Sequence, residues 1–367
     1  MRPVSVLIFH APARGTGPRE IAFERCRAIL AEHHRAGFLA AGASTATIVT
    51  EPADGEPFGA RLGRALRAHA ATGVGVVLLG SGALPLAGTA DRRRFVEVAG
   101  GPIGHALANN RFSADAIAVA DAAVLLGLPA VRGDNEIPRW LAETAGVDVA
   151  DLSARWRMQF DLDSPLDIVL AGRDRACPTG LRAAAADFEG DPARTALRTA
   201  LGGVAEVMAD RTAELVVVGR TSARTLRWLE LNARCRVRAL VEERGMRTAG
   251  ATGRANRRPP RSVLGRLLDL GADGPTGLAQ ELVRLGDAAI VDSRVLLAHR
   301  LGADEAGWPA PEDRFASDLL EPASIADPWL RDLTQSAASE AMPILLGGHS
   351  LVGPGVRLLG RAARNPG

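Results

Sequence analysis

The chain has 367 residues, of which 47% are hydrophobic and 23% are charged, and its formal net charge is +2. These values exclude a disordered or fibrous chain and predict a globular protein long enough for two domains. The small net charge gives no basis for strong nonspecific binding, so we expect no nucleic-acid partner. No apolar run reaches the length of a membrane span, and we therefore expect a cytoplasmic protein with no membrane partner.

The composition also excludes several kinds of catalysis. The sequence contains no lysine and no tyrosine, so all 44 basic residues are arginines. A Walker A loop, a Schiff-base lysine and a tyrosine acid or base are therefore impossible. The cysteines Cys26, Cys177 and Cys235 lie far apart without a CxxC pair, which argues against a disulfide framework and a structural zinc site.

The first half of the chain alternates predicted strands and helices. Short branched apolar runs predict strands at 4–9, 45–49 and 74–79, and apolar residues at helical spacing predict helices at 21–37 and 58–70. This order predicts a parallel sheet covered on both faces by helices, with ligands at the carboxyl ends of its strands.

The loop between the first strand and the first helix, residues 10–20, is rich in glycine and proline. Small residues at such a position let backbone N–H groups approach an anion. Arg14, Gly15, Gly17 and Arg19 are therefore candidates to contact a phosphate, and an ordinary connecting loop is the alternative.

Two further segments carry candidate nucleotide contacts. The third strand runs into a glycine-containing turn with Ser81 and Gly82. Asn109 and Asn110 precede residues 113–125, which we expect to form a helix whose positive N-terminus could attract an anion. The alternative for the second segment is a polar turn before a capped helix.

Residues 156–170, WRMQFDLDSPLDIVL, are the most informative run. In an extended segment Asp161 and Asp163 share a face and could hold a hard cation such as Mg²⁺. Ser164 followed by proline predicts the start of a helix, with Asp167 in its first turn. The alternative is a strand, a turn and a capped helix whose acids are only solvated.

This run resembles the closing motif, roughly F-D-[IV]-D-[ST]-P-x-D-[IL], of nucleotidyltransferases with the nucleotide-diphospho-sugar transferase (GT-A) fold. The guanylyltransferases acting on molybdopterin or on 2-phospho-lactate and phosphoenolpyruvate are the most similar in size. The resemblance covers about the first 172 residues. It implies a Rossmann-like α/β domain, an NTP and a small anionic acceptor as partners, and Mg²⁺ held by Asp161 or Asp163.

The chain departs from that family at two places. The family's first loop, close to L-x-G-G-x-S-x-R-[ML]-G followed by lysine, has only the four loop candidates above as equivalents. A family motif similar to [GP]-x-D-x-P-[LF]-[LI] keeps its Pro-Leu part at Pro85, but Gly82 or Ala83 replaces its metal-binding aspartate. Asp91 and Asp115 are candidate substitutes for that acid.

A change of composition at residues 173–192 marks a domain boundary, so we predict domains at 1–172 and 196–367. The second has its own α/β pattern and matches no family that we recognise. Its predicted strands end in short polar turns that could form a second ligand site, namely 219–222, 292–294 and 347–350. The arginine-rich loop 242–261 could close over an anion or be an ordinary solvated loop.

Two readings of function follow. In the first, arginines of the first loop and a metal on Asp161 and Asp163 position an NTP for transfer of its nucleotidyl group, so that Arg14, Arg19 and Asp163 are the catalytic candidates. In the second, the first domain binds a nucleotide or sugar nucleotide without transferring it, and any activity, such as phosphoester or methyl-group chemistry, resides in the second domain.

Overall fold

The computed structural model describes residues 2–13, 15–50, 56–70, 73–129, 131, 136–242 and 260–362. The chain forms two compact α/β units. The first contains residues 1–14, 24–162 and 176–181, and the second contains 15–23, 163–175 and 182–367. Two segments near the expected site, residues 15–23 and 163–175, therefore belong to the second unit.

The first unit is built on a six-stranded mixed sheet with the order β2-β1-β3-β5-β4-β6. Its strands are β1 (Val4–Phe9), β2 (Thr45–Val49), β3 (Gly75–Gly80), β4 (His105–Ala108), β5 (Ala116–Val119) and β6 (Asp148–Asp151). The first three confirm the predicted strands to within one residue. Strand β5 is antiparallel to both β3 and β4, whereas the remaining pairs are parallel.

The prediction of a helix over residues 113–125 is wrong, and so is that of a purely parallel sheet. All four residues of β5 are buried in the middle of the sheet. A short apolar run of this kind fits a buried strand as well as a buried helix segment, and its periodicity does not separate them. A 3₁₀ helix, η1 (Ala122–Gly127), follows the strand.

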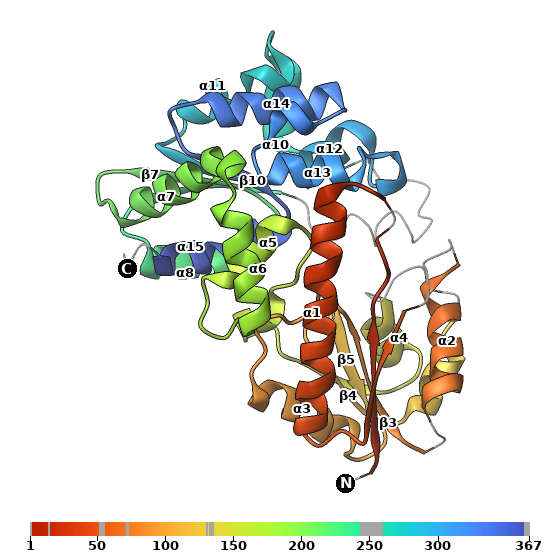
Figure 1. Ribbon diagram of the computed structural model, residues 1–367. Helices are drawn as coiled ribbons and strands as arrows, with labels where there is room; N and C mark the ends of the chain where they lie inside the picture. The colour runs from red at the N-terminus through yellow and green to blue at the C-terminus, as the bar shows by residue number, and fades with distance from the viewer. Residues whose placement is uncertain are drawn as a thin grey trace. The chain divides into compact units, whose positions relative to one another are not determined.

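Helices cover both faces of the mixed sheet (Figure 1). One face packs against α1 (Pro18–Ala40) and α3 (Thr89–Ala99), whose Phe38 and Phe95 lie in one core cluster with β1 and β3. The other face packs against α2 (Phe58–His69) and α4 (Ile137–Glu143). The alternation of apolar residues along β1 supplies both cores, because neighbouring side chains point to opposite faces.

The second unit is built on a four-stranded sheet with the order β10-β9-β7-β8, in which all pairs are parallel. Its strands are β7 (Glu214–Gly219), β8 (Arg236–Val241), β9 (Ala288–Asp292) and β10 (Ile344–Gly347). Strands β8 and β9 lie on opposite sides of β7, so the strand order reverses next to β7. In open parallel sheets such a reversal leaves a crevice at the carboxyl ends of the strands, where ligands bind.

The helices of the second unit begin with α5, which starts directly after Ser164 as predicted. They are α5 (Pro165–Gly172), α7 (Thr195–Ala209), α8 (Ala223–Asn232), α10 (Val263–Leu270), α11 (Leu278–Val283), α12 (Ser293–Leu301), α13 (Pro311–Asp318), α14 (Pro328–Ser339) and α15 (Val356–Ala362). Helix α6 (Thr179–Gly190) has residues in both units, as does α1. The three cysteines are buried. Within the described ranges no helix has the length and apolar character needed to cross a membrane.

Candidate functional site

The turn after β3 and the acidic run meet in the first unit. Ala83 forms an antiparallel bridge with Asp161, and the backbone N–H of Leu162 donates to the carbonyl of Gly82 at 2.9 Å. Two segments almost 80 residues apart in the sequence, both expected at the site, are thus paired through their backbones. Leu84, at the end of the turn, has a φ of 51°, a left-handed conformation that is uncommon for a branched residue and clusters at functional sites.

The same pairing leaves no room for an acid in the turn. A Cβ at Gly82 would lie 2.8 Å from the carbonyl oxygen of Leu162. The side chain of Ala83 is buried in the apolar core beneath α1 and α3. A carboxylate at either position would therefore require a backbone shift or an unpaired charge in the core.

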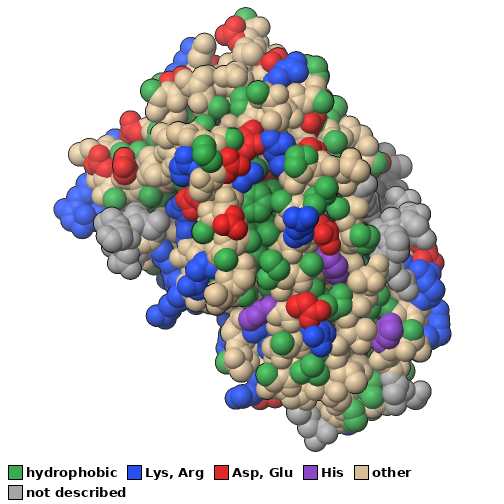
Figure 2. Space-filling model, in the orientation of Figure 1, with side chains coloured by type: hydrophobic (Ala, Val, Ile, Leu, Met, Phe, Trp, Pro, Cys, Tyr) green, Lys and Arg blue, Asp and Glu red, His purple; other side chains and the backbone are tan. Residues whose placement is uncertain are grey.

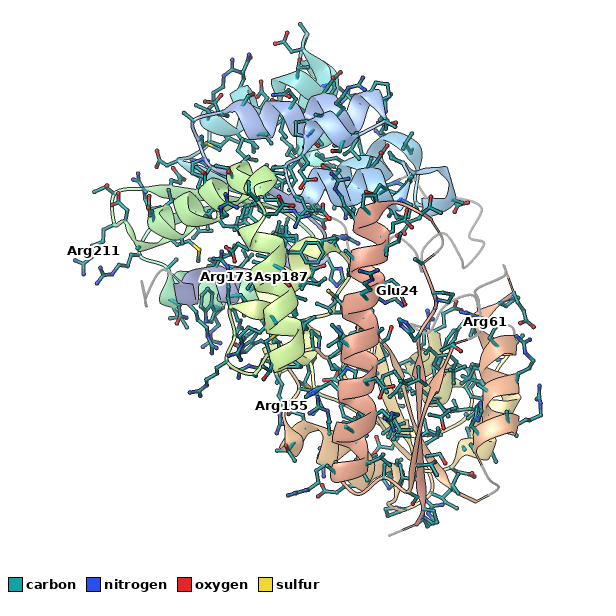
Figure 3. The ribbon with its side chains drawn as sticks, viewed as in Figure 1. Glu24, Arg61, Arg155, Arg173, Asp187 and Arg211 are labelled. Atoms are coloured by element: carbon teal, nitrogen blue, oxygen red, sulfur yellow. The ribbon has the colours of Figure 1, made fainter. Side chains whose placement is uncertain are left out.

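The two candidate substitute acids make other contacts in the first unit. Asp91 accepts a hydrogen bond from the backbone of Gly88 at 2.9 Å and forms an ion pair with Arg155, which is labelled in Figure 3. Asp115 accepts from the side-chain amide of Asn109 at 3.1 Å. Both carboxylates thus stabilise the structure around them through these contacts.

A hydrogen-bond network that the sequence did not suggest anchors the turn after β3. His10, directly after β1, places Nδ1 3.0 Å from the Ser81 hydroxyl and Nε2 2.8 Å from a carboxylate oxygen of Glu24 on α1 (Figure 3). The guanidinium Nε of Arg27, one turn further along α1, donates to Ser81 Oγ at 3.1 Å. Ser81 is fully buried. A histidine and a serine after two neighbouring parallel strands were the available signal, but their partners on α1, Glu24 for His10 and Arg27 for Ser81, depend on tertiary packing.

The side chain of Asn109 also stabilises the fold through hydrogen bonds. Its side-chain oxygen accepts from the backbone N–H groups of Asp115 and Ala116 at 3.0 and 3.1 Å, and its amide donates to the carbonyl of Met158 at 3.0 Å. Asn109 therefore joins the end of β4 to the start of β5 and to the segment before the acidic run. Asn110 accepts from the backbone of Phe112 at 3.0 Å and closes a local turn.

The candidate residues of the first loop that the structure describes belong to the second unit and contact carboxylates of that unit. Arg19 donates through Nη1 to Glu312 and through Nε to Glu321, each at 2.7 Å. Burial lowers the pKa of Arg19, but these two carboxylates outweigh burial, and the pKa is raised. The N–H of Gly15 donates to Glu20 at 3.1 Å.

Gly17 of the same loop has no space for a side chain, because a Cβ there would lie 2.2 Å from the Glu312 carboxylate. The structure thus surrounds Arg19, Gly15 and Gly17 with acids. Arg14 lies outside the described residues.

The second unit collects polar side chains at the carboxyl ends of β7, β9 and β10. Arg220 follows β7 and donates to Asp292 at the end of β9, at 2.6 Å through Nε and 3.0 Å through Nη2. Burial lowers the pKa of Arg220, but Asp292, together with the charge of Asp163, raises it above its usual value. His349 follows β10, and its Nδ1 lies 3.4 Å from Oδ2 of Asp163.

Helix α5 fixes the position of Asp163. The carboxylate of Asp167 accepts from the backbone N–H of Asp163 at 3.0 Å and from that of Ser164 at 2.8 Å. This capping arrangement satisfies N–H groups that the start of a helix leaves without partners. It also holds the backbone of Asp163 against the first turn of α5. The position from which the Asp163 side chain extends is therefore fixed.

In the second unit the carboxylate of Asp163 and the imidazole of His349 are close enough to bind one metal ion. Their side chains are 52% and 39% exposed, whereas Asp161, two residues before Asp163 in the chain, is 9% exposed. A carboxylate and an imidazole are chemically suitable donors for a divalent cation.

A small, mostly apolar pocket lies in the first unit, near the ends of β1 and β3. Its lining includes the aromatic rings of Phe9 and Phe58, Ile137 of α4 and the carboxylate-bearing Asp115. On the face of the molecule in Figure 2, arginine side chains are interspersed with acidic ones and form no continuous basic patch among the described residues.

Comparison of the chain with protein-family models, with curated proteins and with solved structures finds no match.

Proposed function

We propose that the protein is a nucleotidyltransferase of the GT-A type, which binds an NTP with Mg²⁺ and transfers its nucleotidyl group to a small phosphorylated acceptor. The observation that carries this proposal is the backbone pairing of Ala83 with Asp161. The turn after β3 and the run 156–170 are the two segments that the resemblance assigns to the site, and the turn is adjacent to the part of that run, through Leu162, that lies in the same unit.

The donor atoms suit the proposed ion. Asp161 and Asp163 offer carboxylate oxygens, the ligands that Mg²⁺ prefers, and Asp163 is partly exposed, as a site that admits a substrate requires. When bound, Mg²⁺ would neutralise charge on the NTP phosphates and on the pyrophosphate that leaves.

Other groups of the first unit would bind and orient the nucleotide. Arg27 places a guanidinium beside Ser81 at the end of β3, which supplies positive charge in a chain without lysine. The rings of Phe9 and Phe58 give the adjoining cavity a surface on which a nucleobase could pack. The acceptor would attack the α-phosphorus directly, so these groups contribute positioning and charge stabilisation.

A second candidate function is nucleotide binding without transfer, with any chemistry in the second unit. The closely packed turn at Gly82 and Ala83 favours it, because the family's second metal-binding acid has no space there. The polar cluster at the carboxyl ends of β7, β9 and β10 favours it as well, since such ends are the usual ligand sites of parallel sheets.

Thermal unfolding with each of the four NTPs, with and without Mg²⁺, tests nucleotide binding, because a ligand selective for the native state raises its apparent stability. We expect a Mg²⁺-dependent rise with one NTP that is lost in Asp163→Ala and kept in Asp148→Ala, which removes a 77% exposed acid of β6. Release of pyrophosphate with 2-phospho-lactate or phosphoenolpyruvate as acceptor then distinguishes transfer from binding. A nucleotide-induced shift that is the same in Asp163→Ala and the parent protein would contradict the proposed metal site.

A further inference from the structure

His349 and Asp163 approach each other at the carboxyl edge of the parallel sheet of the second unit. His349 lies two residues beyond β10, and Asp163 immediately precedes the N-cap of α5. We infer that His349 is a ligand of the cation held by Asp163, and that the site therefore selects a transition-metal dication such as Mn²⁺, Co²⁺ or Zn²⁺ over Mg²⁺. This inference rests on the proposed metal site and names the class of ion that occupies it.

The distance between the two side chains fits a shared ion. Two ligand atoms that each lie about 2.0–2.2 Å from one metal, at tetrahedral or octahedral angles, are separated by roughly 2.8–3.6 Å. The observed separation of Nδ1 and Oδ2 is 3.4 Å. A direct hydrogen bond between imidazole and carboxylate is usually shorter, at about 2.7–3.2 Å.

The backbone around both residues is held in place by packing. Gly347 ends β10, and a Cβ there would lie 2.8 Å from Leu351 and 3.2 Å from Leu166 of α5. The end of β10 and the start of α5 are thus in close contact. Because Asp163 is fixed to the first turn of the same helix, its distance from His349 is set by the packed core of the second unit.

The donor types determine which ion is preferred. An imidazole nitrogen suits Mn²⁺, Co²⁺ and Zn²⁺, whereas Mg²⁺ binds oxygen ligands and retains several waters. The partial exposure of His349 and Asp163 leaves coordination positions for water or a phosphate oxygen, as in catalytic rather than structural metal sites.

The competing explanation is an ion pair between protonated His349 and Asp163 that involves no metal. The first unit contains a matched example: Nδ1 of His105 also lies 3.4 Å from an oxygen of Asp148. That pair is exposed and joins β4 to β6. His105→Ala therefore controls for the loss of a surface histidine–carboxylate pair.

The experiment measures binding of Co²⁺ and of Mg²⁺, each alone, to the full-length chain after removal of metals with a chelator. Calorimetry gives the affinities, and the visible absorption of Co²⁺ reports nitrogen ligation. We expect the parent protein to bind Co²⁺ at least about tenfold more tightly than Mg²⁺. His349→Ala and His349→Asn should each lose most of this preference and change the Co²⁺ spectrum, with little change in Mg²⁺ affinity. His105→Ala should bind both ions as the parent does.

Asp163→Ala distinguishes failure of the histidine ligand from failure of the whole metal site. If Asp163→Ala loses metal binding while both His349 variants keep the Co²⁺ affinity and spectrum of the parent, the histidine ligand is excluded and the proposed metal site stands. If Asp163→Ala and the parent bind each ion equally, or if the parent binds neither ion, the metal site and the inference both fail.

Discussion

Arg294 and Asp318 form a bidentate ion pair in the interior of the parallel-sheet unit, with N–O distances of 2.7 and 2.5 Å. Asp318 is fully buried and Arg294 is 9% exposed. Burial by itself lowers the pKa of Arg294, but the charge of Asp318 outweighs burial and the pKa is raised. The pair lies directly beneath the end of β9, because Arg294 also donates to the hydroxyl of Ser293 at 2.9 Å.

Replacing one partner of this pair should destabilise the fold strongly. Arg294→Leu leaves the Asp318 carboxylate buried without its counter-charge, and we expect a loss of about 3–5 kcal/mol in the free energy of unfolding. The double variant Arg294→Leu/Asp318→Leu should recover much of this loss, since no unpaired charge remains. Urea denaturation of the parent protein and of the two variants measures these free energies of unfolding.

The control is Arg139→Leu, which breaks an exposed pair with Glu143 on α4 and should cost less than about 1 kcal/mol. An Arg294→Leu variant as stable as Arg139→Leu would show that Asp318 does not carry an unpaired buried charge.

The carboxylate of Asp167 should affect metal binding without contacting the ion. Asp167→Ala removes the acceptor of the Asp163 and Ser164 N–H groups, and we expect the free energy of unfolding to fall by about 1–3 kcal/mol. The Asp163 carboxylate should then lose its fixed position, so metal affinity measured by calorimetry should fall as well. Asp327→Ala removes an acidic N-cap of α14 and should lower stability alone. Equal metal affinities in the two variants would limit Asp167 to helix capping.

His34 should make the stability of the first unit sensitive to acid. It is fully buried on α1, and Nε2 donates to the Ala83 carbonyl at 2.7 Å. Burial, assisted by the positive charge of Arg92, lowers its pKa from 6.5 to about 3. The unfolded chain therefore binds a proton below pH 6.5 that the folded chain rejects until about pH 3, and stability falls as the pH drops through this window.

The resulting loss between pH 7 and pH 5 should be about 2 kcal/mol, and His34→Gln, which keeps a donor near the Nε2 position, should remove that part of the pH dependence. Denaturation curves at several pH values measure the difference. A His34→Gln variant that loses as much stability between pH 7 and 5 as the parent would assign the titration to another group.

Local sequence signals were sufficient for several regular elements of the chain and for the start of α5. Strand β1 and the capping of α5 by Ser164 and Asp167 depend on residues adjacent in the sequence, and both match the prediction. Strand β5 was mistaken for a helix because its four apolar residues carry no distinguishing period.

The contacts of the candidate site depend on packing that no local pattern reports. Ser81 contacts His10 and Arg27, and His10 in turn contacts Glu24, so the network joins two segments brought together by the sheet and α1. The acids around Arg19 lie almost 300 residues further along the chain. A sequence can show that an arginine could contact a phosphate, but not that two glutamates already contact it.

Gly82 should be one of the least replaceable glycines of the first unit. A Cβ at this position would lie 2.8 Å from the carbonyl oxygen of Leu162, in the pairing that holds the turn after β3 against the acidic run. We expect Gly82→Ala to lower the free energy of unfolding by about 1–3 kcal/mol, because a backbone must shift to admit the methyl group. The variant should also lose the nucleotide-induced thermal shift, since Asp161 pairs with the neighbouring Ala83.

Gly80 provides the matched control, because it ends β3 two residues earlier and an added Cβ there would meet no atom within 4 Å. Gly80→Ala should therefore unfold at nearly the temperature of the parent and keep its response to nucleotide. Thermal unfolding of both variants, with and without NTP and Mg²⁺, tests the difference. If Gly82→Ala matches Gly80→Ala in both properties, the close approach at Leu162 does not constrain the turn, and the family's acid is missing for a reason other than space.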